Sequence, residues 1–114
     1  MTDALVSSTP PPGKDEPPNT WPGNDSVFSI GPDEYAVWET ERGTGKRIGL
    51  HTWHWDQANG HWCGGWLGFT NVEGHPPRSK HELVREDPLT VAPSLLCSRC
   101  QHHGWIRDGQ WVPA

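Results

Sequence analysis

Two cysteines separated by two residues constrain this chain more than any other feature. The chain has 114 residues and three cysteines, of which Cys97 and Cys100 form a Cys-x-x-Cys pair. A disulfide framework would leave one thiol without a partner, whereas a metal site can use all three. The spacing is that of a zinc knuckle, in which a tight turn lets two thiolates face one ion. The sequence therefore predicts a metal centre at this turn.

The predicted centre needs two further ligands, because a structural zinc ion binds four protein side chains. His103 follows Cys100 by three residues and can reach the same ion as the chain leaves the turn. Gly104 after it gives the backbone freedom to reverse into the last hairpin. Cys63 is the remaining cysteine, and the two glycines after it let another loop approach closely. We therefore predict one structural Zn²⁺ per chain, bound by Cys63, Cys97, Cys100 and His103.

The histidines leave one alternative open. Cys63 could instead be a buried apolar residue, and the fourth ligand would then be His102, His61 or His54. A separate catalytic metal site built from His51, His54 and His61 is not expected, because strand alternation places His51 and His54 on opposite faces. Residues 43–47 resemble a phosphate-binding loop, but that motif needs glycine where the chain has Thr40 and Ser or Thr where it has Arg47. We therefore predict that the protein is not an enzyme.

Composition divides the chain near residue 23. Residues 1–22 hold six of the twelve prolines and few apolar residues, so we predict a disordered proline-rich arm there. Residues 23–114 form the predicted domain, and a domain of this size buries only roughly 60% of its unfolded surface, so a metal staple is expected. The chain has eight tryptophans, seven of them in this domain, and they predict a core packed around a few large rings.

Alternation of apolar and polar residues predicts antiparallel hairpins. Residues 35–40 and 46–55 show the period-2 pattern of two paired strands. The Asp-Gln-Ala-Asn-Gly turn at 56–60, with positive φ expected at Asn59 and Gly60, predicts that residues 62–70 pair back. Asp108-Gly109 lies at the tip of the last hairpin.

The predicted fold is mostly β, a small zinc-stapled antiparallel sheet of hairpins with a zinc knuckle. Residues 82–85 are predicted as either a short strand or one helical turn. No segment shows a sustained 3.6-residue apolar repeat, so little helix is expected.

Charge and hydropathy limit the partners. The net charge is −5, and residues 23–114 carry eight basic against eleven acidic side chains, which disfavours broad binding to nucleic acid. A local basic face around Arg78, Arg85 and Arg99 keeps a nucleic-acid-binding knuckle as an alternative. No apolar run is long enough to cross a membrane, and no secretory signal is recognisable, so a cytoplasmic protein is expected.

Strand alternation also predicts a partner surface. His51, Trp53 and Trp55 share one face of the strand at 46–55, while Leu50 on the opposite face is a core candidate. Tryptophan is enriched at the energetic centres of protein interfaces. We therefore predict that His51, Trp53 and Trp55 bind a protein partner.

The C-terminal half resembles small proteins of unknown function encoded by phages of actinobacteria. The resemblance covers about the last sixty residues and rests on Cys63-Gly-Gly-Trp-Leu-Gly-Phe, Glu86-Asp-Pro-Leu-Thr-Val, Pro93-Ser-Leu-Leu-Cys-Ser-Arg-Cys and His103-Gly-Trp-Ile-Arg-Asp-Gly-Gln-Trp-Val-Pro-Ala. Glycine would be the commoner residue at position 101, where this chain has Gln101. The resemblance implies a phage protein in the host cytoplasm and supplies no activity.

Together these observations favour a non-catalytic module that binds a protein of the host or of the phage. A virion or capsid-associated protein is the first alternative, in which the proline-rich arm extends across neighbouring subunits. A nucleic-acid-binding zinc knuckle is the second.

Overall fold

The computed structural model describes residues 11–114, and residues 1–10 of the predicted arm lie outside the described part. The described chain is mostly β, as predicted, with one short 3-10 turn, η2 (Pro18–Thr20), near its start. Its strands are β1 (Phe28–Gly31), β2 (Glu34–Thr40), β3 (Arg47–Asp56), β4 (His61–Gly68), β5 (Glu82–Glu86), β6 (Leu89–Leu96), β7 (His103–Arg107) and β8 (Gln110–Pro113).

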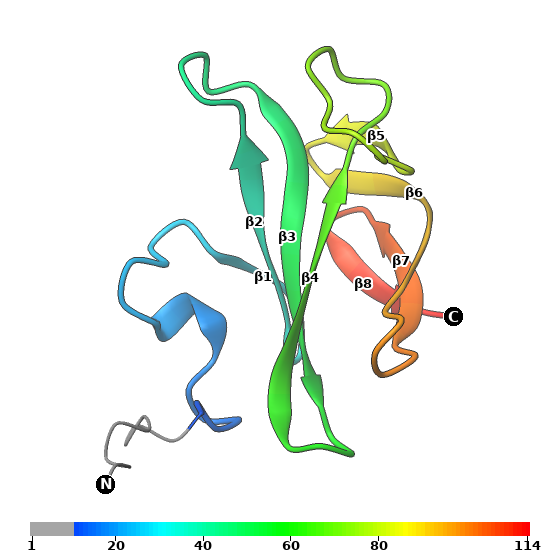
Figure 1. Ribbon diagram of the computed structural model, residues 1–114. Helices are drawn as coiled ribbons and strands as arrows, with labels where there is room; N and C mark the ends of the chain where they lie inside the picture. The colour runs from blue at the N-terminus through cyan, green and yellow to red at the C-terminus, as the bar shows by residue number, and fades with distance from the viewer. Residues whose placement is uncertain (1–10) are drawn as a thin grey trace, which may run out of the picture.

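The strands divide between two sheets rather than forming one. The first sheet has the order β1-β2-β3-β4 and the second has the order β5-β6-β7-β8, and every neighbouring pair is antiparallel. The second sheet lies on one side of the first, and residues 11–27, before β1, lie on the other side (Figure 1). The first sheet therefore has one inner face against the second sheet and one outer face.

The predicted hairpins are confirmed, and their turns use the residues that the sequence indicated. The hairpin of β2 and β3 closes through Gly43 (φ 89°) and Gly45 (φ 73°). Asp108 (φ 50°) and Gly109 (φ 80°) close the hairpin of β7 and β8 with the two positive φ angles of a type I′ turn. The segment left open between strand and helical turn is strand β5.

The turn between β3 and β4 differs in detail from the prediction. Gly60 alone has a positive φ there (66°), although Asn59 was expected to share it. The carboxylate of Asp56 accepts hydrogen bonds from the backbone N–H groups of Ala58 (3.1 Å) and Asn59 (3.2 Å) and from the Asn59 side chain (2.8 Å). This Asx-type turn provides acceptors for the backbone N–H groups of the loop, so no second residue needs a left-handed conformation.

The core is aliphatic, contrary to the expectation of a core built on tryptophan. It lies between the two sheets and consists of Ile30, Ala36, Leu50, Leu67, Phe69, Leu89, Val91, Leu95 and Ile106. None of the eight tryptophans is buried, and Trp38 and Trp111 pack only at the core's edge. An indole is large and carries an N–H group that needs a partner, so a half-buried position suits it better than a thin core between sheets.

Two further features complete the fold. Strand β1 was not predicted, because its four residues are too few to show an alternating pattern. Among residues 11–114, no helix has the length and apolarity that a membrane crossing requires.

Candidate metal centre

The inner face of the first sheet meets the knuckle at a group of four donor side chains. His54 in β3 and Cys63 in β4 are directly paired across the two strands, so both side chains point to the same face. Cys97 and Cys100 come from the turn that joins β6 and β7 in the second sheet. The group therefore draws two donors from each sheet.

The four donor atoms lie close enough together to hold one metal ion. All of them are within 4.8 Å of one another. His54 Nε2 is 2.9 Å from Cys100 Sγ, and Cys63 Sγ is 3.5 Å from Cys97 Sγ. Ligands at about 2.0–2.3 Å from a tetrahedral ion are about 3.6–3.8 Å apart. That spacing lies within the 4.8 Å limit of the group, and the two closest pairs are shorter than it. All three cysteines are free thiols.

The knuckle turn is held by its own backbone. The N–H of Cys97 donates to the carbonyl oxygen of His102 (2.8 Å), and the N–H of Gln101 donates to that of Cys97 (2.7 Å). Gln101 has a φ of 66°, in the left-handed region that favours glycine. Glycine would adopt this conformation at a lower cost than Gln101 does.

The surroundings of the thiols push their pKa values apart. Burial, together with the neighbouring thiols Cys97 and Cys100, raises the pKa of Cys63 to about 12. Burial opposes ionisation of Cys97 as well, but hydrogen bonds from the backbone N–H groups of Cys100 and Arg99 outweigh it and lower the pKa of Cys97 to about 7. Burial, followed by the charge of His102, lowers the pKa of His54 to about 4. At neutral pH His54 is therefore in the neutral form that binds metals and Cys97 is partly in the thiolate form, whereas Cys63 stays protonated until a metal displaces its proton.

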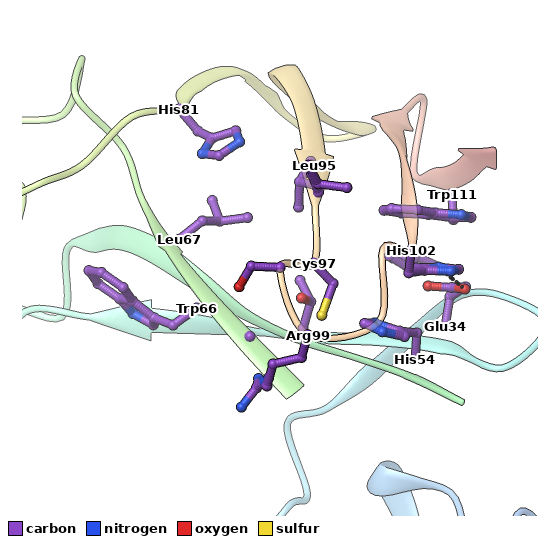
Figure 2. A pocket seen from close by; sticks show the side chains of 15 residues that line it. Glu34, His54, Trp66, Leu67, His81, Leu95, Cys97, Arg99, His102 and Trp111 are labelled. Atoms are coloured by element: carbon purple, nitrogen blue, oxygen red, sulfur yellow. Dashed lines mark ion pairs between the residues drawn. The ribbon is translucent and has the colours of Figure 1, made fainter. Parts of the chain in front are cut away.

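Arg99 supplies positive charge beside the thiols. It lies between the two knuckle cysteines, and the negative charge of Cys63, with a hydrogen bond to Cys97, raises its pKa. Figure 2 shows the Arg99 side chain directed outward from the turn. Three thiolates and one divalent ion sum to −1, and an adjacent guanidinium offsets that charge.

His103, expected as one of the four ligands, does not join the group. It is the first residue of β7 and is exposed, and its Nε2 lies 2.9 Å from Ser94 Oγ. Side chains in β7 alternate between faces, and the buried positions are Gly104 and Ile106. His103 consequently faces outward, and His54 stands where His103 was expected.

Gly104 has a different role from the one predicted. Its φ is not in the positive range, and it lies inside strand β7 rather than at a reversal. A Cβ at this position would meet the ring of Trp111 at 2.6 Å. The carbonyl oxygen of Val112 would lie even closer, at 2.5 Å, so glycine is required because both the neighbouring strand and the Trp111 indole approach the backbone there.

The His54 ring is the first of three stacked rings. The His102 ring lies 4.2 Å from the His54 ring and 4.6 Å from the Trp111 ring, nearly parallel to both. Glu34, paired with His54 across β2 and β3, places its Oε2 2.7 Å from His102 Nε2. His102 Nε2 makes no hydrogen bond of acceptable geometry, so its contact with Glu34 is close but poorly aligned. Burial, followed by the charge of Asp33, raises the pKa of Glu34 to about 8.

The centre opens on one side into a cavity of about 390 Å³ between the sheets. Figure 2 shows Glu34, His102 and Trp111 along one wall and Trp66, Leu67 and His81 along the other. Glu34, His54 and His102 also lie within 4.8 Å of one another, but His54 belongs to the four-residue group already described.

The predicted partner residues lie on the outer face of the first sheet. The rings of His51 and Trp53 are 4.3 Å apart, and Trp55 meets Trp62 edge-on at 5.3 Å. Trp62 also meets Tyr35 edge-on at 5.7 Å. We name these five side chains, Tyr35, His51, Trp53, Trp55 and Trp62, the aromatic face. Sequence reasoning missed Tyr35 and Trp62, although both alternate with buried residues in strands that it identified.

Comparisons with protein-family models, with curated proteins and with solved structures find no match to this chain. The interpretation of the site therefore depends on its own chemistry.

Proposed function

We propose that His54, Cys63, Cys97 and Cys100 bind one structural zinc ion per chain. Three thiolates and one imidazole are a donor set typical of structural zinc sites. The observation in support is the origin of the donors, two from each sheet. An ion bound there would join the sheets of a domain whose core holds few residues, which is where a small protein needs a staple.

We propose further that the domain is a non-catalytic module that binds a protein partner through the aromatic face. Catalytic zinc sites keep an open position for water or substrate, and four protein ligands leave none. The observation that carries the proposal is the aromatic face itself, which gathers four large rings and His51 on the side of the sheet away from the core. Partly exposed tryptophan and tyrosine side chains are enriched at interface hot spots.

Charge favours a protein over a nucleic acid as the partner. The chain is net negative, and Lys14, which follows the Gly13 that accepts a hydrogen bond from Trp62, is paired with Asp33 at 3.4 Å. A protein that binds a phosphate backbone needs a positive surface. The resemblance to phage proteins indicates that host proteins and other phage components are the partners to search.

The test is capture of partners by the full-length protein and by two substituted forms. Trp53→Ala and Trp55→Ala remove rings from the aromatic face, whereas the control Trp105→Ala removes a half-buried ring from β7 in the second sheet. Bound proteins are identified by mass spectrometry and retested in purified form. We expect the partner to bind the wild type and the control and to lose at least ~10-fold in affinity with either of the other variants, as for a hot-spot residue.

Two results would contradict this proposal. One is capture of RNA or DNA with a steep salt dependence, which would indicate phosphate contacts. The other is loss of bound zinc and of the folded state in both the Trp53→Ala and the Trp55→Ala variant, which would mean that these rings are structural.

A further inference from the structure

Two thiols of the metal centre belong to different sheets and lie close together. Cys63 Sγ in β4 is 3.5 Å from the Sγ of Cys97, which follows β6. The third thiol, Cys100, has His54 as its near neighbour, with 2.9 Å between Sγ and Nε2. The two sulfurs of a disulfide are about 2.05 Å apart. Cys63 and Cys97 therefore need only a small side-chain movement to form one.

Small molecules can reach both of these sulfurs. Cys97 is half-buried and lines the cavity between the sheets that Figure 2 shows. Cys63 is buried but lines a second cavity, of about 620 Å³, together with His61. Cys100 lines neither cavity, whereas Arg99 lines both. Cysteines that react with oxidants are partly exposed and have a cation beside them.

We propose that Cys63 and Cys97 form an oxidation site for hydrogen peroxide, at which a disulfide between the two sheets replaces the zinc ion. This inference rests on the proposed function, because the same thiols bind the ion. After oxidation His54 and Cys100 are the two donors that remain of the group, too few to hold a structural zinc ion. The ion is therefore released when the disulfide forms.

The reaction consumes one peroxide molecule and transfers two electrons from sulfur to oxygen. Zinc holds its cysteine ligands as thiolates, which are the nucleophilic form. The more exposed Cys97 attacks one peroxide oxygen, the O–O bond breaks, and Cys97 becomes a sulfenic acid as hydroxide leaves. The Cys63 thiolate then attacks Cys97 Sγ, so that the S–S bond forms and the S–O bond breaks. Two protons from solvent convert both hydroxide ions to water.

The position of the disulfide decides what it does to the fold. Cys63 and Cys97 are 34 positions apart and come from different sheets, whereas Cys97 and Cys100 share one turn. A cross-link across a long loop constrains the unfolded chain more than one across a short loop. The disulfide between Cys63 and Cys97 therefore keeps the sheets joined without the metal.

The experiment oxidises the zinc-loaded, full-length protein with hydrogen peroxide, blocks the remaining thiols and maps the disulfide by mass spectrometry. Trypsin cleaves after Arg99 and so separates Cys97 from Cys100, which places the three cysteines in peptides 48–78, 86–99 and 100–107. We expect one zinc ion to be released per chain, and the protein to be about 2 Da lighter than its reduced zinc-free form, for two lost hydrogen atoms. Peptide 48–78 should be linked to peptide 86–99.

A second measurement tests the effect on the fold without any substitution. Thermal unfolding is followed in a strong chelator, before and after oxidation. We expect the oxidised protein to unfold at a higher temperature than the reduced protein, because the cross-link constrains the unfolded chain. A thiol reductant should abolish the difference.

The proposal is wrong if peptide 86–99 is linked to peptide 100–107, if the disulfide joins two protein molecules, or if the thiols become sulfinic acids without any disulfide. It is also wrong if a molar excess of peroxide leaves the zinc bound, or if oxidation does not raise the unfolding temperature in chelator. These results would leave the proposed zinc centre intact. A protein that carries no zinc before oxidation would instead contradict the zinc centre, and the peptide map would still show which thiols pair.

Discussion

The two halves of the metal centre are built in different ways. Cys97 and Cys100 lie in one four-residue turn that its own backbone hydrogen bonds hold together, whereas His54 and Cys63 are brought together by the register of β3 and β4. The knuckle half is local, so it can form as soon as the turn forms. The sheet half exists only when two strands are correctly paired, so a metal ion bound by both halves couples strand register to the association of the sheets.

The largest effect is expected when either half loses a thiolate. Cys63→Ser and Cys100→Ser each remove one ligand from the same ion, and binding energy at such a site is largely folding energy. We expect both variants to lose zinc and to unfold to a similar extent, and a strong chelator to do the same to the wild type at neutral pH. Circular dichroism and zinc analysis measure this. Stability unaffected by the chelator would show that the sheets do not depend on the ion.

A histidine pair distinguishes the structural ligand from the predicted one. His54→Ala removes a donor from the group, whereas His103→Ala removes an exposed ring that contacts Ser94. We expect His54→Ala to lower zinc affinity at least ~100-fold, while His103→Ala changes stability by no more than about 0.5 kcal/mol, as for a surface substitution. Competition with a zinc indicator gives the affinities. A weak effect of His54→Ala with a strong effect of His103→Ala would show that His103, and not His54, is the histidine ligand.

Glu34 provides a pH-dependent test of the ring stack behind His54. Its pKa in the folded protein is about 8, above the usual value of 4.5. Between these two pH values the Glu34 carboxyl is protonated in the folded state and ionised in the unfolded state. Stability from this group is therefore complete below about pH 4.5 and is lost as pH rises towards 8. Glu34→Gln should be as stable as wild type near pH 5 and more stable near pH 8. Urea unfolding at both pH values measures this, and a difference that does not change with pH would contradict it.

The smallest effect concerns the knuckle turn itself. Gln101 has a φ of 66°, and a residue with a Cβ is strained in that conformation. Gln101→Gly should therefore stabilise the protein by about 0.5–1 kcal/mol, with no change in zinc stoichiometry. Thermal unfolding of the zinc-loaded protein gives the difference, and destabilisation would mean that the Gln101 side chain contributes more than its backbone conformation costs.

The same contrast explains how much of the molecule could be predicted from the sequence. Short-range signals were sufficient for the hairpin at Asp108-Gly109 and for the grouping of Cys97 with Cys100. They were insufficient for the histidine ligand. Identifying His54 requires the register of β3 with β4, and excluding His103 requires knowing which face of β7 its side chain occupies. The division into two sheets also depends on contacts between residues far apart in sequence, such as Leu50 and Ile106 in the shared core.

The tryptophans show a second limit of sequence reasoning. Their number predicted a core of large rings, yet composition does not record which face of a strand a residue occupies. In β3 the alternation that buries Leu50 and His54 places Trp53 on the outer face. The predicted partner face at His51, Trp53 and Trp55 followed from that alternation, whereas the proline-rich segment over it did not, because composition alone indicated a disordered arm there.

X-ray absorption at the zinc edge tests the central claim most directly, that one ion takes ligands from both sheets. We predict three sulfur ligands at about 2.3 Å and one nitrogen ligand at about 2.0–2.1 Å in the wild type. The His103→Ala variant should give the same spectrum. Any zinc that the His54→Ala variant retains should give a spectrum without the imidazole nitrogen. A zinc-free protein with a disulfide between Cys97 and Cys100, or an imidazole signal that persists in His54→Ala and disappears in His103→Ala, would contradict the account.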